Sequence, residues 1–163
     1  MKCLLIVWHS MTGGAALMAA AAAQAARSGA EVQVRCQRAV DTSADDVLSA
    51  DGYVFVTPEN LASMSGLMKD FFDRIYYSAL DRVNGRPCAL LVCAGSDGQG
   101  AVRQVQRICT GLRLKEVAPP TIVITHAQTP ERILAPKDIA EADLARCREV
   151  GAALAAGLAA GVF

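Results

Sequence analysis

Five short apolar runs recur along the chain, and stretches with helical periodicity separate them. The runs are rich in Val, Ile and Leu, and they comprise residues 3–8 (CLLIVW), 32–36 (VQVRC), 53–57 (YVFVT), 88–94 (CALLVCA) and 121–125 (TIVIT). Four of the runs are almost continuously apolar, which is typical of strands covered on both faces of a sheet. Residues 32–36 alternate instead, as an edge strand does. The pattern therefore predicts five strands, the second of them at an edge.

Predicted helices fill the gaps between these strands. Apolar positions spaced at i, i+3 and i+4 predict four long helices and one short one, over residues 15–28, 45–50, from 64 onward, 101–114 and 137–158. Strands that alternate with helices indicate βαβ units, a parallel sheet and right-handed crossovers. We therefore expect residues 1–163 to form a single doubly wound α/β domain with the strand order 2-1-3-4-5.

Composition excludes several classes of partner. Hydrophobic residues make up 53% of the chain and charged residues 20%, which is typical of a globular protein with a sizeable core. Lys plus Arg and Asp plus Glu number 16 each, and no segment is strongly basic. We therefore expect neither nucleic acid nor a membrane as a partner. No apolar run is long enough to span a bilayer.

Six scattered cysteines indicate a reducing compartment. None forms a Cys-x-x-Cys pair and none has a histidine at metal-ligand spacing, so we expect free thiols, no metal site and a cytoplasmic location. The start of the chain also has some features of a cleaved secretory signal. We do not favour that alternative, because polar residues 8–14 interrupt the apolar run and cleavage would remove the first strand.

The loop after the first apolar run has the chemistry of an anion site. Residues 9–14 read HSMTGG and precede a predicted helix. A helix N-terminus presents unpaired N–H groups, Ser10 and Thr12 add hydroxyl donors, and the two glycines let the backbone approach a guest. The pattern predicts a terminal phosphate that is held by amides and hydroxyls without a cationic side chain. An ordinary capped turn is the alternative, because Ser and Thr are also favoured N-caps.

Two further loops follow the third and fourth apolar runs. Residues 57–66 (TPENLASMSG) contain Pro58, which suits the exit from a strand, and Ser63 or Ser65, which can cap the next helix. Residues 94–100 (AGSDGQG) are rich in glycine, which suits backbone lying against a ligand. Ligands of doubly wound sheets bind at the carboxyl ends of the strands, so one ligand can contact all three loops.

Other phosphate-binding motifs do not match the sequence. It contains no GxxxxGK[ST] motif and no Cys-x₅-Arg loop, and its glycine-rich segment follows the fourth strand without the GxGxxG register. These observations disfavour a P-loop nucleotidase, a cysteine phosphatase and a dinucleotide-binding Rossmann domain.

The three loops together resemble those of flavodoxin-like FMN reductases and quinone reductases. SMTGGA (10–15) is similar to the flavodoxin phosphate loop, [ST]-x-T-G-x-[TN]. TPENLASMSGLMKDFFDR (57–74) resembles the reductase pattern P-x-x-x-x-x-(M/I)-S-G-x-(M/L)-K-x-F-x-D-R, and CAGSDGQGA (93–101) resembles the third FMN loop. The likeness covers most of the chain. It implies a flavodoxin-like three-layer α/β sandwich with a five-stranded parallel sheet.

The resemblance also implies that the protein binds FMN without a covalent bond and uses NAD(P)H as co-substrate to reduce a quinone-like or flavin acceptor. The FMN-binding positions that it implies are Ser10, Met11, Thr12, Gly13, Gly14, Ala15, Pro58, Glu59, Asn60, Leu61, Ser63, Met64, Ala94, Gly95, Ser96, Asp97, Gly98 and Gly100. No catalytic side chain is assigned, because the cofactor carries the hydride chemistry. Members of the family often form dimers or tetramers, so a homodimer or homotetramer is expected.

Two departures from the family pattern keep alternatives open. Ala15 stands where Thr or Asn is common, which removes one hydrogen bond to the phosphate, worth about 1 kcal/mol. Leu61 and Met64 occupy the middle loop, where flavodoxins place an aromatic residue. An FMN-dependent NAD(P)H oxidoreductase is the favoured function. A flavodoxin-type electron carrier and a binding module that has lost FMN are the alternatives.

Overall fold

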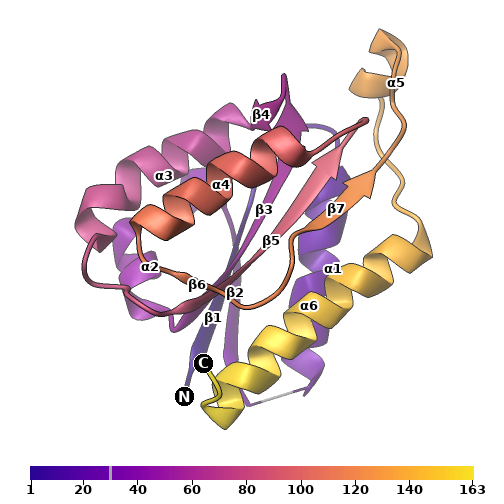
Figure 1. The fold of residues 1–163 in the computed structure, drawn as a ribbon. Coiled ribbons are helices and arrows are strands. Elements are labelled where there is room, and N and C mark those ends of the chain that lie inside the picture. Colours follow the sequence, from indigo (N-terminus) through magenta and orange to yellow (C-terminus); the bar gives the residue numbers. More distant parts are fainter. Residues whose placement is uncertain (30) are drawn as a thin grey trace.

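A central parallel sheet runs through the computed structural model, which describes residues 1–29 and 31–163 (Figure 1). Its strands are β1 (Cys3–Trp8), β2 (Gln33–Arg38), β3 (Gly52–Asn60), β4 (Ser63–Met64), β5 (Pro87–Ala94), β6 (Lys115–Glu116) and β7 (Thr121–Ile124). Five of them lie parallel in the order β2-β1-β3-β5-β7. This arrangement confirms the predicted order 2-1-3-4-5. The fifth strand is interrupted, because β6 pairs with the start of β5 and β7 with its end.

Helices cover both faces of the sheet. They are α1 (Gly14–Gly29), η1 (Ala39–Asp41), α2 (Ala44–Ser49), α3 (Gly66–Ala79), α4 (Gln99–Gly111), α5 (Pro130–Leu134) and α6 (Glu141–Ala160). Residues of α2, α3 and α4 share a core with one face of the sheet, and residues of α1 and α6 share a core with the other. Figure 1 shows this three-layer arrangement, with α5 projecting past the ends of the strands.

The continuous apolar runs reflect burial on both faces of each strand. In β1, Leu5 and Val7 point into the core below α3, whereas Leu4 and Ile6 point into the core below α1. Successive side chains of a strand alternate between the faces, so both sets of positions must be apolar. β2 lies at an edge and is mostly half-buried, as its alternating sequence predicts.

Two predicted helices begin later than the periodicity indicates. Met64 fits the apolar spacing of the following helix, but it belongs to β4, and α3 begins at Gly66 after the Ser65 N-cap. Residues 137–140 are not helical, and α6 begins only at Glu141. The backbone N–H of Lys137 donates instead to Thr12 O at 2.8 Å, which draws this segment onto the loop after β1. Tertiary contacts therefore override the local pattern at both places.

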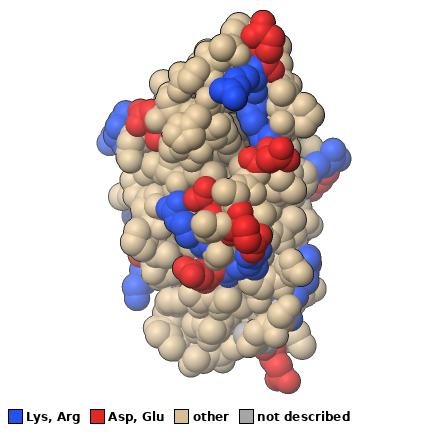
Figure 2. Space-filling view, turned by 90° about the vertical axis from the view of Figure 1, so that its right-hand side faces the viewer, with Lys and Arg blue, Asp and Glu red and all other residues tan. Residues whose placement is uncertain are grey.

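Charges of both signs mix on the surface. Figure 2 shows Lys, Arg, Asp and Glu interspersed on the face turned to the viewer, with no broad area of one sign. On α6, Arg146 pairs with Asp143 and Arg148 pairs with Glu141. Within the described residues, no helix combines the length and the apolar character needed to cross a membrane.

Candidate functional site

A cavity of about 530 Å³ lies at the carboxyl ends of β1, β3 and β5. The three loops predicted to meet there all contribute to its lining. The predicted residues that line it are Ser10, Met11, Thr12, Gly14, Ala15, Pro58, Glu59, Asn60, Leu61, Ala94, Gly95 and Ser96. Parallel strands bring their carboxyl ends to one edge of the sheet, so residues almost 90 positions apart line one cavity.

Several predicted glycines shape the loops without lining the cavity. Gly13 and Gly98 adopt left-handed backbone, with φ of 99° and 85°, and each lies directly before a helix. A Cβ atom on Gly100 would lie 2.0 Å from the carbonyl oxygen of Ala62, so this position leaves no room for a side chain. Asp97, next to Gly98, is also outside the lining.

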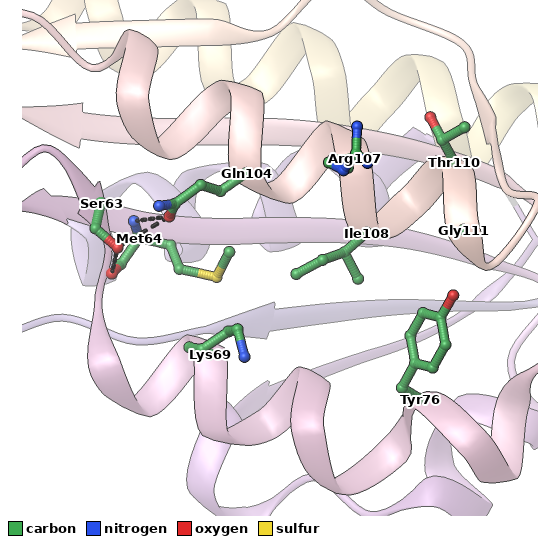
Figure 3. Close-up of a pocket in the computed structure, with 9 residues that line it drawn as sticks. All are labelled: Ser63, Met64, Lys69, Tyr76, Gln104, Arg107, Ile108, Thr110 and Gly111. Atoms are coloured by element: carbon green, nitrogen blue, oxygen red, sulfur yellow. Dashed lines mark hydrogen bonds between the residues drawn. The ribbon is translucent and has the colours of Figure 1, made fainter.

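Ser63 and Met64 line a different cavity, between α3 and α4. The volume of this cavity is about 690 Å³, and Figure 3 shows Tyr76 and Thr110 at the end away from Ser63 and Met64. The side-chain oxygen of Gln104 accepts hydrogen bonds from the Met64 N–H at 3.0 Å and from the Ser63 hydroxyl at 2.9 Å. These two residues thus fasten β4 to α4.

The first turn of α1 has N–H donors without a partner, which indicates a site for an anion. Gly14 and Ala15 are buried, and the described part of the chain provides no acceptor for their N–H groups. Such groups are costly to bury unpaired. The Gly13 N–H donates to Ser10 Oγ at 3.0 Å, which leaves the Ser10 O–H free to donate. Amides and hydroxyls of this kind fit a phosphate group.

Close packing against β5 requires glycine at position 14. A Cβ atom there would lie 2.6 Å from Cys93 Sγ and 3.3 Å from Lys137 Cβ. Burial raises the pKa of the Cys93 thiol to about 11, although the charge of Lys137 opposes this shift. The thiol is therefore neutral at physiological pH and places no negative charge beside the loop.

The middle loop is a tight hairpin rather than an open loop. β3 continues to Asn60 and pairs with the antiparallel β4. Leu61 and Ala62 form the turn with φ of 52° and 60°, a left-handed conformation that is strained for residues with a Cβ atom. The turn holds the Leu61 side chain fully exposed, at 101% of its reference area, at the rim of the cavity.

Glu59 joins the middle loop to the third loop. Its carboxylate accepts hydrogen bonds from the N–H groups of Gly98 at 2.9 Å and Ala101 at 3.1 Å, at the N-terminus of α4. A carboxylate is favourable at this position because it meets unpaired donors and the positive end of the helix dipole. The charge of Glu59 therefore stabilises the protein's own backbone.

A fourth segment completes the cavity, and sequence reasoning missed it. The additional lining residues are Ala62, Cys93, Thr125, Ala127, Gln128, Ile133, Leu134 and Lys137. Most of them belong to the chain between β7 and α6, which includes α5. A signal for α5 was present, because Thr129 is its N-cap and Pro130 its first residue, a favoured start for a helix. His126 lies in the same segment but outside the lining.

Lys137 corrects the expectation that no cationic side chain approaches the first loop. Its ammonium group donates to Thr12 Oγ1 at 3.1 Å, to Ile133 O at 2.7 Å and to Ala135 O at 2.6 Å. Lysine and threonine are 125 positions apart in the sequence, so neither local spacing nor composition indicates their contact.

His9 is not among the residues that line the cavity, and it joins the first loop to Ser65, the N-cap of α3. Its Nδ1 atom is 2.8 Å from the hydroxyl of Ser65, which also lies 3.3 Å from the Thr57 hydroxyl. Burial lowers the pKa of His9 below its ordinary value, because the charged imidazolium would lose hydration. A structural role for His9 fits these contacts.

The mouth of the cavity is apolar and open. Four side chains at its rim are substantially exposed, namely those of Met11, Leu61, Ile133 and Leu134. Among the described residues, no aromatic side chain lines the cavity. The cavity thus combines a polar end at α1 with an apolar rim, and these two parts suit a phosphate and a flat apolar ring.

A family described as "NADPH-dependent FMN reductase" matches residues 29–129. This range contains the middle and third loops, whereas Ser10–Ala15 and Lys137 lie outside it. "Flavodoxin" of Aquifex aeolicus is 30% identical over 97 residues, which cover 60% of this chain and 52% of that protein. "NAD(P)H dehydrogenase (quinone)" of Acidithiobacillus ferrooxidans is 31% identical and covers 45% of this chain and 47% of that one.

The chain thus spans about half the length of these curated relatives. Among solved structures, a flavodoxin from the domain Archaea superposes with a TM-score of 0.77 and 18% identity, over 96% of this chain and 99% of that one. This likeness confirms the flavodoxin-like fold.

Proposed function

Because the chain belongs to the NADPH-dependent FMN reductase family, a family of FMN-binding oxidoreductases, we propose that it holds FMN in the cavity at the carboxyl ends of β1, β3 and β5. We propose further that it passes hydride from NAD(P)H to a quinone-like or flavin acceptor. The observation that carries the proposal is the meeting of three predicted loops around one cavity with a polar and an apolar part. That cavity has the size usual for small-molecule sites.

The polar end receives the phosphate in this proposal. The N–H groups of Gly14 and Ala15 and the hydroxyls of Ser10 and Thr12 are the donors that the first loop offers. They need no rearrangement, because the helix start and the glycine turn hold them in place. Gly14 is too close to Cys93 for any side chain, so the backbone itself can approach the phosphate.

The apolar rim receives the ring system. Pro58 and Leu61 approach from the β3–β4 hairpin, Ala94 from the end of β5, Gly95 from the loop after it, and Ile133 from α5. When bound, FMN supplies the hydride chemistry, and the chain orients the ring and excludes water from one side of it. Because the rim is open and no aromatic side chain of the described residues covers it, a nicotinamide or a quinone can stack on the exposed side of the ring.

An electron carrier is the second candidate, since the "Flavodoxin" of Aquifex aeolicus is among the relatives. The uncovered rim favours the reductase, because a carrier that exchanges single electrons with proteins needs no space for a nicotinamide. We also propose that the electron acceptor is quinone-like or a flavin, and that the protein forms a homodimer or a homotetramer.

The test begins with a titration of the purified apoprotein with FMN, followed by flavin fluorescence, with riboflavin as the control that lacks phosphate. Tighter binding of FMN than of riboflavin supports the phosphate site. NADPH and NADH oxidation are then measured with and without a quinone. Oxidation stimulated by the quinone supports the reductase, whereas bound FMN that neither nicotinamide reduces favours the carrier. If the protein binds neither flavin, the result would contradict both the reductase and the electron carrier. A binding module that has lost FMN would then be the remaining hypothesis.

A further inference from the structure

Lys137 is a cationic residue of the cavity lining for which the loop motifs do not account. It comes from the segment between α5 and α6, and it meets the first loop twice. The backbone N–H donates to Thr12 O at 2.8 Å and the ammonium donates to Thr12 Oγ1 at 3.1 Å. We propose that Lys137 is a positioning residue of the phosphate site, which places a positive charge beside the phosphate and directs the Thr12 hydroxyl toward it, while its own three N–H groups stay with protein oxygens; this inference rests on the proposed binding of FMN.

Among the residues that the structure describes, no carboxylate pairs with the charge of Lys137. All three recorded acceptors of the ammonium are neutral, one hydroxyl and two carbonyl oxygens. None of the ion pairs found among residues 1–29 and 31–163 includes Lys137. The residue is also half-buried. A half-buried ammonium is strongly stabilised by an anion, and the adjacent loop already has unpaired amide donors for one.

Lys137 also sets the direction of the Thr12 hydroxyl. Because Thr12 Oγ1 accepts from the ammonium, its own O–H is left to donate elsewhere. Ser10 Oγ is in the same state, since it accepts from the Gly13 N–H at 3.0 Å. Both hydroxyls of the loop are therefore arranged as donors toward a phosphate. This arrangement offsets the hydrogen bond that Ala15 cannot supply.

A purely structural role is the competing explanation. The ammonium also donates to Ile133 O and Ala135 O, so it ties the end of α5 to the first loop. Loss of that tie would loosen Ile133 and Leu134 at the rim, where they line the cavity. A loosened rim would weaken the binding of FMN and of riboflavin alike, whereas loss of the positive charge beside the phosphate weakens the binding of FMN alone.

The experiment compares Lys137→Gln, Lys137→Arg and Thr129→Ala with the wild type, using flavin fluorescence to obtain the Kd for FMN and for riboflavin. Thr129→Ala removes the side-chain cap of α5, in which Thr129 accepts from the Arg132 N–H, and leaves Lys137 in place. We expect Lys137→Gln to raise the Kd for FMN about 10- to 100-fold and the Kd for riboflavin less than about 3-fold. Lys137→Arg should retain most of the affinity for FMN.

Salt provides a second readout, because the interaction of a charge with phosphate is screened. Wild-type affinity for FMN should fall as salt is raised, and in Lys137→Gln this dependence should be smaller. Equal weakening of both flavins in Lys137→Gln, or unchanged FMN affinity, would overturn the role of Lys137 while the wild type still binds FMN. A wild type that binds neither flavin would refute the proposed function itself. Circular dichroism checks that each variant is folded.

Discussion

Gly14 shows how one residue fixes the distance between a strand and a helix. The first turn of α1 passes so close to β5 that a Cβ atom at this position would lie 2.6 Å from Cys93 Sγ. No rotamer of an alanine relieves that contact, so either the thiol or the helix must move. The same closeness holds the helix N-terminus over the cavity.

Gly14→Ala should therefore lower the free energy of unfolding by about 1–3 kcal/mol, as overpacking does in a dense core. Urea denaturation measures the loss. In a Cys93→Ala background the same substitution should be less damaging, because the smaller side chain leaves room for the new methyl group. If Gly14→Ala lowers the free energy of unfolding equally in both backgrounds, contact with the Cys93 thiol is not the reason that position 14 requires glycine.

His9 provides a test of pH dependence. Because burial lowers the pKa of His9 in the folded protein, the unfolded chain binds a proton more readily below the ordinary value of 6.5. The stability that neutral His9 contributes is thus complete above pH 6.5 and is lost as the pH falls through the lowered pKa. Between about pH 7 and 5, urea denaturation should show a smaller decline for His9→Gln than for the wild type. Parallel declines would contradict this assignment.

At the residue scale, a sequence can indicate a site only where the chemistry is local. The hydroxyls of Ser10 and Thr12 and the glycines at 13 and 14 lie together before one helix, so their spacing alone indicates an anion site. Lys137 carries no such signal, because its contact with Thr12 depends on how α6 and the segment before it pack. A charge that arrives from a distant segment is not visible in the loop that it serves.

Among the elements, the β3–β4 hairpin has a conformation that the sequence did not predict. Its turn contains Leu61 and Ala62, both left-handed, where Asn and Gly are the residues that favour such a turn. Asn60 before the turn indicated a loop here, but neither turn position carries Asn or Gly, so the hairpin was not predicted and Met64 was assigned to the apolar spacing of the following helix. Strain of this kind at the rim of a cavity is common where a side chain must be presented to a ligand.

Ala62→Gly should relieve part of this strain and raise the free energy of unfolding by about 1 kcal/mol, since glycine adopts positive φ without steric cost. Thermal unfolding measures the change. Ala153→Gly is the matched control, because Ala153 is exposed within α6, where glycine should lower the stability by about 1 kcal/mol. A loss of stability in both variants would show that the turn is not strained.

The molecule as a whole depends on α6 closing the second face of the sheet. α6 packs directly on α1, and a Cβ atom on Gly151 would lie 2.1 Å from the carbonyl oxygen of Ala22. The alanine-rich sequence of α1 and the glycine in α6 let the two backbones approach closely. The alternation of strand and helix patterns along the chain predicted the strand order and the layers. It could not predict the close approach of the α1 and α6 backbones, because these two helices are far apart in sequence.

Gly151→Ala should lower the free energy of unfolding by at least about 1–3 kcal/mol, because the new methyl group meets backbone, which cannot rotate away. Gly66→Ala is the control, since a Cβ atom there meets nothing within 4 Å. Urea denaturation of both variants separates the effect of close packing from that of glycine itself. A small loss at position 151, similar to that of the control, would mean that α6 shifts freely on α1.

The contact between Thr12 and Lys137 joins positions 125 residues apart in the sequence. This separation has a consequence for the chain while the ribosome is still making it. A chain made from its N-terminus releases the HSMTGG loop from the ribosome long before Lys137 exists. Until then water must satisfy the amides of Gly14 and Ala15. A nascent chain that ends before residue 137 would present the loop without the contact from Lys137, and only a chain that extends past this residue would acquire the complete proposed anion site.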